Sequence, residues 1–398
     1  MTNLPQGWEV KKLGEIGEIV TGSTPSKSNL DFYGKDYPFF KPSDFEQGYF
    51  LENAGDNLSK LGFDKARQLP PKTILVVCIG SLGKVALTRV IGSCNQQINA
   101  IIPHKNIIAE YIYYYCISSK FQSILFSKAP QTTLAILNKT EFSKLEIIYP
   151  KDIKEQERIV GILDESFAKI DESIKILEQN LLNLDELMQS ALQKAFNPLK
   201  DNAKENYKLP QGWEWKSLGE IGEIITGTTP SKNNPNFYGN EYPLFKPSDL
   251  NGDMIIKYAS DNLSKLGFDN ARNLPKDTIL VVCIGASIGK VGLSGVNGSC
   301  NQQINAIIPN SAFTSKYLFF VCLSNYFQEI LKNNASQTTL PIINKTEFSK
   351  LQIPLPPIKE QEQITSHLDE LSSHVKNLKQ NYQAQIKDLQ ELKNSLLD

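Results

Sequence analysis

Leu4-Pro5-Gln6-Gly7-Trp8 is repeated as Leu209-Pro210-Gln211-Gly212-Trp213, and these two pentapeptides begin two copies of one sequence. Lys41-Pro42-Ser43-Asp44 also returns 205 residues later, and after one inserted residue the stretch Asn95–Pro103 returns at an offset of 206. Such an offset is far too long for a solenoid, whose units span roughly 20–50 residues. The 398-residue chain is therefore expected to fold as two similar halves, each long enough to bury its own core.

Each copy ends in a stretch whose apolar residues alternate in steps of three and four, the spacing of a and d positions in a coiled coil. This spacing predicts two long helices, with Gln385 as one polar interruption in the second. Since one narrow apolar stripe needs a partner stripe, we expect the two helices to pair antiparallel; packing of each helix on its own globule is the alternative. The predicted seam residues are Leu163, Phe167, Ile170, Ile174, Leu177, Leu181 and Leu184 in the first helix, and Leu368, Leu371, Val375, Leu378, Tyr382, Leu389 and Leu392 in the second.

The rest of each copy is expected to be a globule of mixed α and β structure. The β-branched runs Thr73–Ile79 and Ile98–Ile102 predict strands, and the aromatic run Tyr111–Phe126 predicts one buried helix. The fold class is thus α/β (α+β) globules in two pseudo-twofold copies, separated by two long antiparallel coiled-coil helices. The expected boundaries are globule 1–153, helix 154–197, linker 198–208, globule 209–357 and helix 358–398.

The composition is that of an ordinary globular protein, with 40% hydrophobic and 21% charged residues. The sequence contains no apolar run long enough for a membrane span, and Met1–Pro5 lacks the pattern of a signal peptide. The six cysteines are three duplicated positions with no C-x-x-C pair, which favours reduced thiols in a cytosolic protein over metal ligands or disulfides. No cofactor or metal ion is expected, and the expected location is the cytoplasm.

Charge is distributed unevenly along the chain although the net charge is only −1. The globular stretches 1–150 and 208–357 carry net charges of +3 and +2, whereas the helical stretches 151–197 and 358–398 carry −4 and −2. The contrast is modest. It permits a surface on each globule that faces phosphates without requiring one.

Two motifs suggest catalysis but lack what catalysis requires. The stretches Gly80–Lys84 and Gly285–Lys290 are shorter than a Walker loop and are followed by valine, so a tight turn is favoured over nucleotide binding. Asn234–Phe237 lacks the second proline of an adenine methyltransferase tetrad. Since neither a Ser/His/Asp nor a paired-carboxylate constellation occurs in both copies, the chain is expected to be non-catalytic.

Both copies do carry amide, hydroxyl and basic side chains in predicted loops. Asn and Gln can read adenine edges, while Lys, Arg, Ser and Thr contact phosphates or bases. The same residue types also cap turns and helices, so either role remains open for each residue. The candidate DNA-binding residues of the first copy are Thr24, Ser26, Lys27, Lys41, Ser43, Lys60, Arg67, Lys84, Arg89, Asn95, Gln96, Gln97, Gln131 and Thr132. Those of the second copy are Thr229, Ser231, Lys232, Lys246, Ser248, Lys265, Arg272, Lys290, Asn301, Gln302, Gln303, Gln337 and Thr338.

Several of these motifs together resemble the specificity subunit of Type I restriction–modification systems. They are Leu-Pro-x-Gly-Trp, Thr-Gly-x-Thr-Pro-Ser-Lys, a Ser-x-Gly-Lys-like turn, Gln-Thr-Thr-Leu or a variant, and Pro-x-x-Glu-Gln at the start of a heptad helix. The last is complete at Pro357–Gln361, whereas the first copy departs from it over Pro150–Gln156. The resemblance covers the whole chain. It implies two target-recognition domains, double-stranded DNA as partner, two modification (adenine methyltransferase) subunits, and recruitment of restriction (translocase-nuclease) subunits.

The sequence therefore predicts a DNA-recognition subunit that reads a bipartite, near-palindromic site and directs adenine methylation or DNA cleavage by partner subunits. A scaffold whose duplicated globules bind protein instead of DNA is the alternative. Two differences between the copies are candidates for distinguishing the half-sites. They are Phe45–Tyr49 opposite Leu250–Met254, and Arg89 opposite Gly295.

Overall fold

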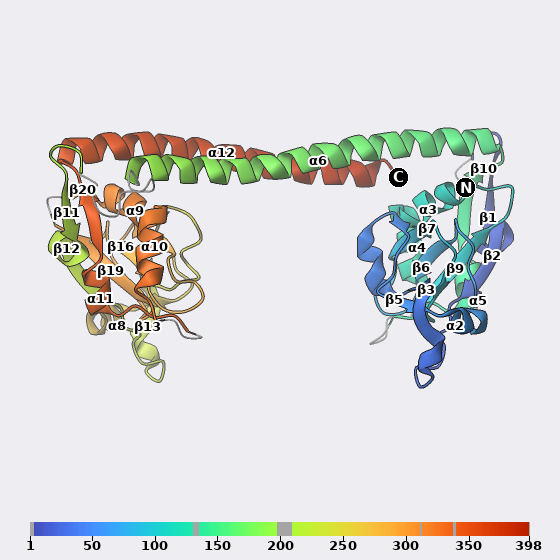
Figure 1. Cartoon of the computed structure of the whole chain (residues 1–398), viewed down its shortest axis with the longest axis horizontal. Helices are drawn as coiled ribbons and strands as arrows, with labels where there is room; N and C mark the ends of the chain where they lie inside the picture. Colours follow the sequence, from blue (N-terminus) through green and yellow to red (C-terminus); the bar gives the residue numbers. More distant parts are fainter. Residues whose placement is uncertain (1–3, 130–134, 197–208, 311–312, 337–339, 398) are drawn as a thin grey trace. The chain divides into compact units, whose positions relative to one another are not determined.

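The chain forms two compact units that repeat the same order of strands and helices (Figure 1). The first unit comprises Met1–Leu177 and Gln383–Asp398, and the second comprises Glu178–Tyr382. Each unit therefore contains one copy of the repeat together with part of each long helix. The computed structural model describes residues 4–129, 135–196, 209–310, 313–336 and 340–397.

A five-stranded sheet in the order β2-β9-β6-β7-β4 forms the centre of the first unit. Its middle strand β6 is buried along its whole length, because its four apolar residues pack on both faces of the sheet. The predicted strands are confirmed at β6 and β9, although β6 ends two residues before the expected Ile79. The strands are β2 (Gly17–Thr21), β9 (Ile98–Pro103), β6 (Ile74–Val77), β7 (Val85–Thr88) and β4 (Phe50–Leu51).

A smaller sheet and a two-stranded ribbon complete the β structure of this unit. In the smaller sheet, β3 lies between β5 and β8 and pairs parallel with β8. The ribbon joins the start of the globule to the strand that precedes the long helix. These strands are β5 (Asp56–Leu58), β3 (Tyr33–Phe40), β8 (Ser93–Cys94), β1 (Trp8–Lys12) and β10 (Glu146–Pro150). The short helices are α1 (Leu13–Ile16), η1 (Leu30–Phe32), η2 (Pro42–Gln47), α2 (Lys60–Lys65) and α5 (Lys139–Ser143).

The expected single helix over Tyr111–Phe126 is instead two helices, α3 (Ala109–Ile117) and α4 (Ser119–Lys128). Ser118 between them has an extended backbone, and its hydroxyl accepts a hydrogen bond from the Phe121 backbone N–H at 3.3 Å. A serine that caps a new helix ends the preceding one, because it offers the backbone an alternative partner. The prediction of one continuous helix was therefore wrong at this residue.

The second unit repeats this arrangement strand for strand. Its five-stranded sheet has the order β12-β19-β16-β17-β14, its smaller sheet the order β15-β13-β18, and its ribbon joins β11 to β20. The strands are β11 (Glu214–Ser217), β12 (Gly222–Thr226), β13 (Tyr238–Phe245), β14 (Ile255–Ile256), β15 (Asn262–Leu263), β16 (Ile279–Val282), β17 (Val291–Ser294), β18 (Ser299–Cys300), β19 (Ile304–Pro309) and β20 (Gln352–Leu355). The helices that precede the last long one are α7 (Leu218–Ile221), η3 (Pro235–Phe237), α8 (Lys265–Asn270), α9 (Ser315–Leu323), α10 (Asn325–Asn333) and α11 (Lys345–Ser349).

The two long helices are α6 (Ile153–Phe196) and α12 (Ile358–Ser395), and they pack antiparallel as predicted. In the first unit, Lys393 of α12 forms an ion pair with Asp171 of α6 at 2.6 Å. In the second unit, Asp185 of α6 forms an ion pair with Lys379 of α12. Between these pairs α6 advances by 14 residues and α12 returns by 14, so both pairs belong to one antiparallel register spaced by two heptads.

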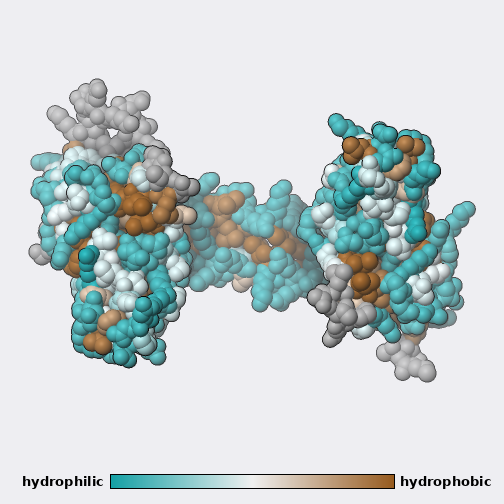
Figure 2. Space-filling view, turned by 90° about the horizontal axis from the view of Figure 1, so that it is seen from below, coloured by the Kyte–Doolittle hydropathy of each residue, from teal (hydrophilic) through white to brown (hydrophobic). Residues whose placement is uncertain are grey.

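The apolar seam of the helices also completes the cores of the globules. Phe167 packs in the core of the first unit, while Leu192 and Phe196, at the far end of α6, pack in the core of the second. The helices therefore pair with each other and also pack on the globules, which were the two alternatives. The burial of Phe196 in the core of the second unit was not predicted. Not every predicted seam residue is covered, because Leu378 and Leu392 are 40% and 48% exposed. Figure 2 shows apolar side chains on the surface of the helical part of the chain.

Replacement of two glycines by alanine should have opposite effects on the stability of the chain. Gly161 lies exposed in α6, where an added Cβ would meet nothing within 4 Å, so Gly161→Ala should stabilise the chain by roughly 0.5–1 kcal/mol. At Gly62 of α2, an added Cβ would lie 1.9 Å from the Phe32 carbonyl oxygen, so Gly62→Ala should cost about 1–3 kcal/mol or more. Urea unfolding of the full chain measures both changes. Equal effects of the two substitutions would contradict this description of α2 and α6.

Candidate nucleic-acid interface

A parallel strand pair brings two of the predicted polar segments together in each unit. β13 and β18 pair in parallel, and the Asn301 backbone N–H donates to the Phe245 carbonyl at 3.0 Å. Lys246 and Asn301 therefore leave the sheet side by side, because each directly follows one of the two strands. In the first unit, β3 and β8 place Lys41 and Asn95 in the same way.

A glycine lets a third segment join them. Gly227, directly after β12, lies so close to the end of β18 that an added Cβ would be 2.2 Å from the Cys300 carbonyl oxygen. In the first unit, a Cβ at Gly22 would lie 2.3 Å from the equivalent Cys94 carbonyl oxygen. Only glycine permits this backbone approach, which explains its place in both copies of Thr-Gly-x-Thr-Pro-Ser-Lys. The loop beyond it carries Thr229, whose hydroxyl donates to Gln302 Oε1 at 2.9 Å.

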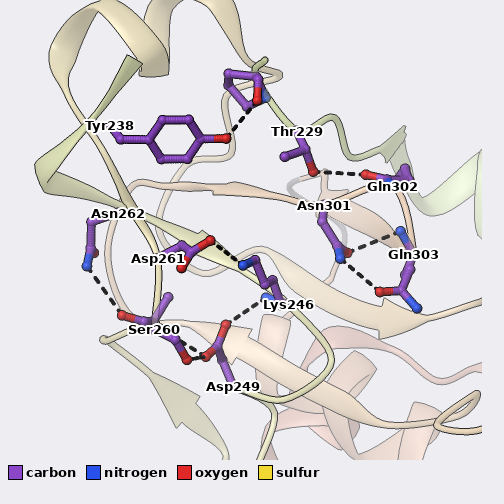
Figure 3. A network of polar contacts seen from close by, with 12 residues as sticks. Thr229, Tyr238, Lys246, Asp249, Ser260, Asp261, Asn262, Asn301, Gln302 and Gln303 are labelled. Atoms are coloured by element: carbon purple, nitrogen blue, oxygen red, sulfur yellow. Dashed lines mark hydrogen bonds and ion pairs between the residues drawn. The ribbon is translucent and has the colours of Figure 1, made fainter. Parts of the chain in front are cut away.

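The three segments form the polar network drawn in Figure 3. Asn301 Nδ2 donates to Gln303 Oε1 at 3.0 Å, and Asn301 Oδ1 accepts from the Gln303 backbone N–H at 3.1 Å. Asn301 is only 7% exposed, so its amide shapes the turn and has little access to a ligand. Gln302 between them is exposed. The first unit repeats this arrangement with Asn95 buried and Gln96 exposed.

The lysine of this network is neutralised within the protein. Lys246 forms an ion pair with Asp261, and the hydrogen bond from Lys246 holds the pKa of that carboxyl below its usual value. The backbone N–H of Lys246 donates to Asp249 Oδ2 at 2.8 Å, while Asp249 Oδ1 accepts from the Ser260 backbone N–H at 3.0 Å. In the first unit, Lys41 pairs with Asp56 in the same manner. These lysines therefore hold loops together. Their acidic partners, Asp56 and Asp261, were not among the residues predicted from the sequence, although they too recur at an offset of 205.

Most of the other basic candidates on each globule also have partners within the chain. The guanidinium groups of Arg67 and Arg272 donate to the backbone carbonyls of Thr21 and Thr226. Lys60 pairs with Asp64 and Lys265 with Asp269, one turn along α2 and α8. Exposed ion pairs of this kind are weak, so a phosphate could displace the carboxylate. The exposed candidates in the loops beside the network are Ser26, Lys27, Ser43, Gln96, Ser231, Lys232, Ser248 and Gln302.

The glycine-rich stretches form tight turns, as predicted. Gly80 and Gly83 have φ angles of 83° and 91°, and their turn joins antiparallel strands β6 and β7. A phosphate loop would instead lead from a strand into a helix. The lysines of the two turns differ in their partners: Lys84 pairs with Glu46, whereas Lys290 Nζ donates to the Pro247 carbonyl at 3.3 Å.

The candidate differences between the copies lie together at one edge of each central sheet. In the first unit, the Arg89 guanidinium stacks 3.6 Å from the centre of the Phe50 ring and pairs with Glu52 at 3.0 Å. In the second unit, Gly295 stands in place of Arg89, and the stem of Lys257 occupies that space, 2.7 Å from where a Gly295 Cβ would lie. Glu52 and Lys257 are equivalent in the repeat, so the Arg89–Glu52 ion pair of the first unit is replaced by a single exposed lysine in the second.

The remaining sequence-predicted features either lie outside this surface or outside the described residues. Gln131, Thr132, Gln337 and Thr338 fall outside the residues that the structure describes. All six cysteines are buried, and burial raises the pKa of the Cys78 thiol to about 12. Among the described residues, no group of histidine, cysteine and acidic side chains could hold a metal ion, and no helix is long and apolar enough to cross a membrane.

The model of the Type I restriction–modification DNA specificity domain matches this chain twice, over residues 5–182 and 210–388. The chain belongs to this family. Each match runs from the first strand of a globule into the long helix that follows. The family's domain therefore corresponds to one globule together with part of its helix.

Curated relatives and solved structures agree with this assignment. The HindI specificity subunit of Haemophilus influenzae is 37% identical over 191 residues, which are 46% of this chain and 42% of that subunit. The MjaIX specificity subunit of Methanocaldococcus jannaschii is 25% identical over an alignment of 410 positions, covering 99% of this chain and 92% of that subunit. A chain from a structural study of assembly and conformational transition of the Type I R-M system has a TM-score of 0.81 at 21% identity, covering 100% and 98% of the two chains. The HsdS subunit of Thermoanaerobacter tengcongensis has a TM-score of 0.61 at 20% identity, covering 99% and 96%. These structures share the fold.

Adjacent residues of the polar network should differ sharply when each is truncated. Asn301→Ala removes a buried amide and leaves Gln303 without two partners, so it should cost about 1–3 kcal/mol in stability. Gln302→Ala removes an exposed side chain, and its stability change should stay within about 0.5 kcal/mol. Urea unfolding of both variants provides the measurement. Equal destabilisation by the two substitutions would show that the network does not divide into a buried and an exposed amide.

Proposed function

We propose that this chain is the non-catalytic DNA-recognition subunit of a Type I restriction–modification complex, working in the cytoplasm. In this proposal each unit reads one half of a bipartite site and directs adenine methylation or DNA cleavage by partner subunits. The observation that carries the proposal is that the same polar surface is built in both units, where an exposed glutamine follows a buried asparagine and accepts a hydrogen bond from a threonine.

The held glutamine is suited to reading base edges. Thr229 donates to Gln302 Oε1, which leaves the Gln302 amide N–H groups directed elsewhere as donors. In the major groove such donors recognise N7 of a purine or O4 of thymine, and a glutamine that also uses its oxygen reads adenine. Gln96 and Thr24 give the first unit the same donor. Lys27, Ser43 and their counterparts would contact phosphates beside it.

Two similar reading surfaces favour two similar half-sites. Reading domains related by a twofold axis meet the two DNA strands in the same way, as in dimeric repressors on palindromic operators. The shared residues of the network therefore support related half-sites on opposite strands. The site is then close to an interrupted palindrome, with differences where the two copies differ.

Partner subunits would supply the chemistry. We expect each repeat to dock one adenine methyltransferase subunit, which gives two per chain, and restriction translocase-nuclease subunits to join through that complex. Charged side chains such as Glu155 and Glu360 in the first turns of α6 and α12 are available for docking.

The helices would set the gap between the half-sites. Seven residues inserted after Leu177 and after Tyr382 keep the heptad register and lengthen each helix by roughly 10 Å at 1.5 Å per residue. The gap between the methylated half-sites should then grow by about three base pairs, since each spans roughly 3.4 Å. Sequencing-based mapping of modified adenines in a host that carries the complete system measures this. The same insertion within the predicted linker 198–208 is the control and should leave the gap unchanged. A contiguous site, or an unchanged gap in an active variant with longer helices, would refute the proposal.

Exchange of the edge that differs between the copies should alter one half-site. Residues 45–53 and 86–92 of the first copy are replaced by residues 250–258 and 292–298 of the second, which removes the Arg89–Glu52 pair and introduces the counterparts Lys257 and Gly295. The first half-site should change toward the second in methylation maps, because a neutral ion pair at this edge is replaced by a single lysine. The reciprocal exchange in the second unit is the matched control. If the halves differ and the first half-site is unaltered by the exchange, this edge does not read DNA.

A further inference from the structure

An exposed isoleucine lies beside the polar network of the first unit. Gln97 directly follows the exposed Gln96, and its Nε2 donates to the Ile79 carbonyl at 3.4 Å. Ile79 forms an isolated antiparallel bridge with Ile136, which is 42% exposed. Because paired strands lie roughly 4.8 Å apart, Ile136 is a direct neighbour of the residue that Gln97 contacts.

The second unit has the same arrangement. Gln303 Nε2 donates to the Ile284 carbonyl at 3.5 Å, and Ile284 bridges to Ile342, which is 40% exposed. Figure 2 shows apolar surface on each globule. An exposed apolar group at the margin of a polar surface therefore belongs to the repeat, as the exposed Gln96 and Gln302 do.

Hydrogen bonds from the neighbouring turn and helix hold this isoleucine in place. The Gly80 backbone N–H donates to the Ala135 carbonyl at 3.2 Å, next to Ile136. The Gln122 amide of α4 donates to the Gly83 carbonyl at 2.9 Å and so ties the same turn to the helix. Equivalent bonds hold the turn of the second unit. A side chain that is ordered before binding loses little conformational entropy when it contacts a ligand.

The chemistry of an A·T base pair matches this combination of groups. In the major groove the pair presents N7 and the N6 amino group of adenine beside O4 and the 5-methyl group of thymine. Glutamine can read the adenine edge, and apolar side chains contact the thymine methyl group. A protein–protein interface comprises about 20–30 residues a side around an apolar centre, whereas each isoleucine here stands beside polar residues.

We propose that Ile136 and Ile342 each contact the 5-methyl group of a thymine in the half-site that their unit reads. The inference rests on the proposed function and extends it from the reading surface to one kind of base. Both units carry the same residue at this place. Each half-site should therefore contain a thymine whose methyl group contributes to binding.

Duplexes in which single thymines are replaced by deoxyuridine test the contact, because uracil pairs as thymine does but lacks the methyl group. The full chain in complex with its methyltransferase subunits is titrated with the mapped site at one fixed salt concentration. One replacement in each half-site should weaken binding about fourfold, the effect of one buried methyl group. If the complex has no bipartite site, the proposed function fails and this inference fails with it. If the complex binds the site equally well with uracil at every position, this inference alone is overturned.

Protein variants identify the side chain that contacts the methyl group. With Ile136→Ala, binding to the thymine duplex should weaken about fourfold or more, and deoxyuridine in the first half-site should cause no further loss. Ile342→Ala should do the same for the second half-site. Val10→Ala is the matched control, since Val10 of β1 is also 42% exposed but lies in the two-stranded ribbon, and it should keep the full effect of uracil. An equal effect of uracil in the Ile136→Ala and unaltered complexes, or loss of methyltransferase binding by Ile136→Ala with that effect unchanged, would refute the contact.

Discussion

Each globule depends on apolar side chains that both long helices supply. Phe167 from α6 and Leu397 just after α12 pack with the first core, while Leu192 and Phe196 from α6 join Leu368 from α12 in the second. Neither copy of the repeat therefore encodes its whole core, because part of it comes from the helix that the other copy encodes. The ion pairs between the helices are exposed and contribute little energy, but they fix which heptads face each other.

The sequence predicts those features that depend on its own periodicity. Duplication, the two long helices and the strands at Ile74–Val77 and Ile98–Pro103 follow from spacing and residue type. The break at Ser118 does not, because a serine within an apolar run caps a helix only where the tertiary structure turns the chain. The burial of Phe196 could not be predicted either, since it depends on a globule that begins after the helix has ended.

In the candidate site too, some features follow from the sequence and others depend on the tertiary structure. Asn-Gln-Gln recurs in both copies and is polar in each. The residue types alone do not show which amide is buried in the turn and which is exposed to a ligand. The parallel pairing of β13 with β18 makes that distinction, because it turns Asn301 inward and Gln302 outward. Likewise Lys246 is a candidate from its residue type alone, and only the position of Asp261 shows that its charge serves the fold.

At the sheet edge where Arg89 and Glu52 lie, the copies exchange side chains that the common framework tolerates. Replacement of Arg89 by Gly295 would leave a gap over the sheet edge, yet the aliphatic stem of Lys257 covers the same place. The change from Glu52 to Lys257 keeps a positive charge where the arginine was lost, so the edge stays polar while a neutral ion pair becomes a single cation. A frame that holds its backbone through glycine contacts and buried amides can carry such exchanges without rearrangement.

Internal neutralisation limits how strongly such a surface attracts DNA by charge alone. The globular stretches carry net charges of only +3 and +2, and Lys41, Lys60 and Lys246 are already paired with aspartates. Counterion release scales with the phosphates that a protein neutralises, so internal pairing of these lysines weakens binding and makes its salt dependence shallower. Under the proposed function, directional contacts from oriented groups such as Gln96 and Gln302 then carry the discrimination between bases.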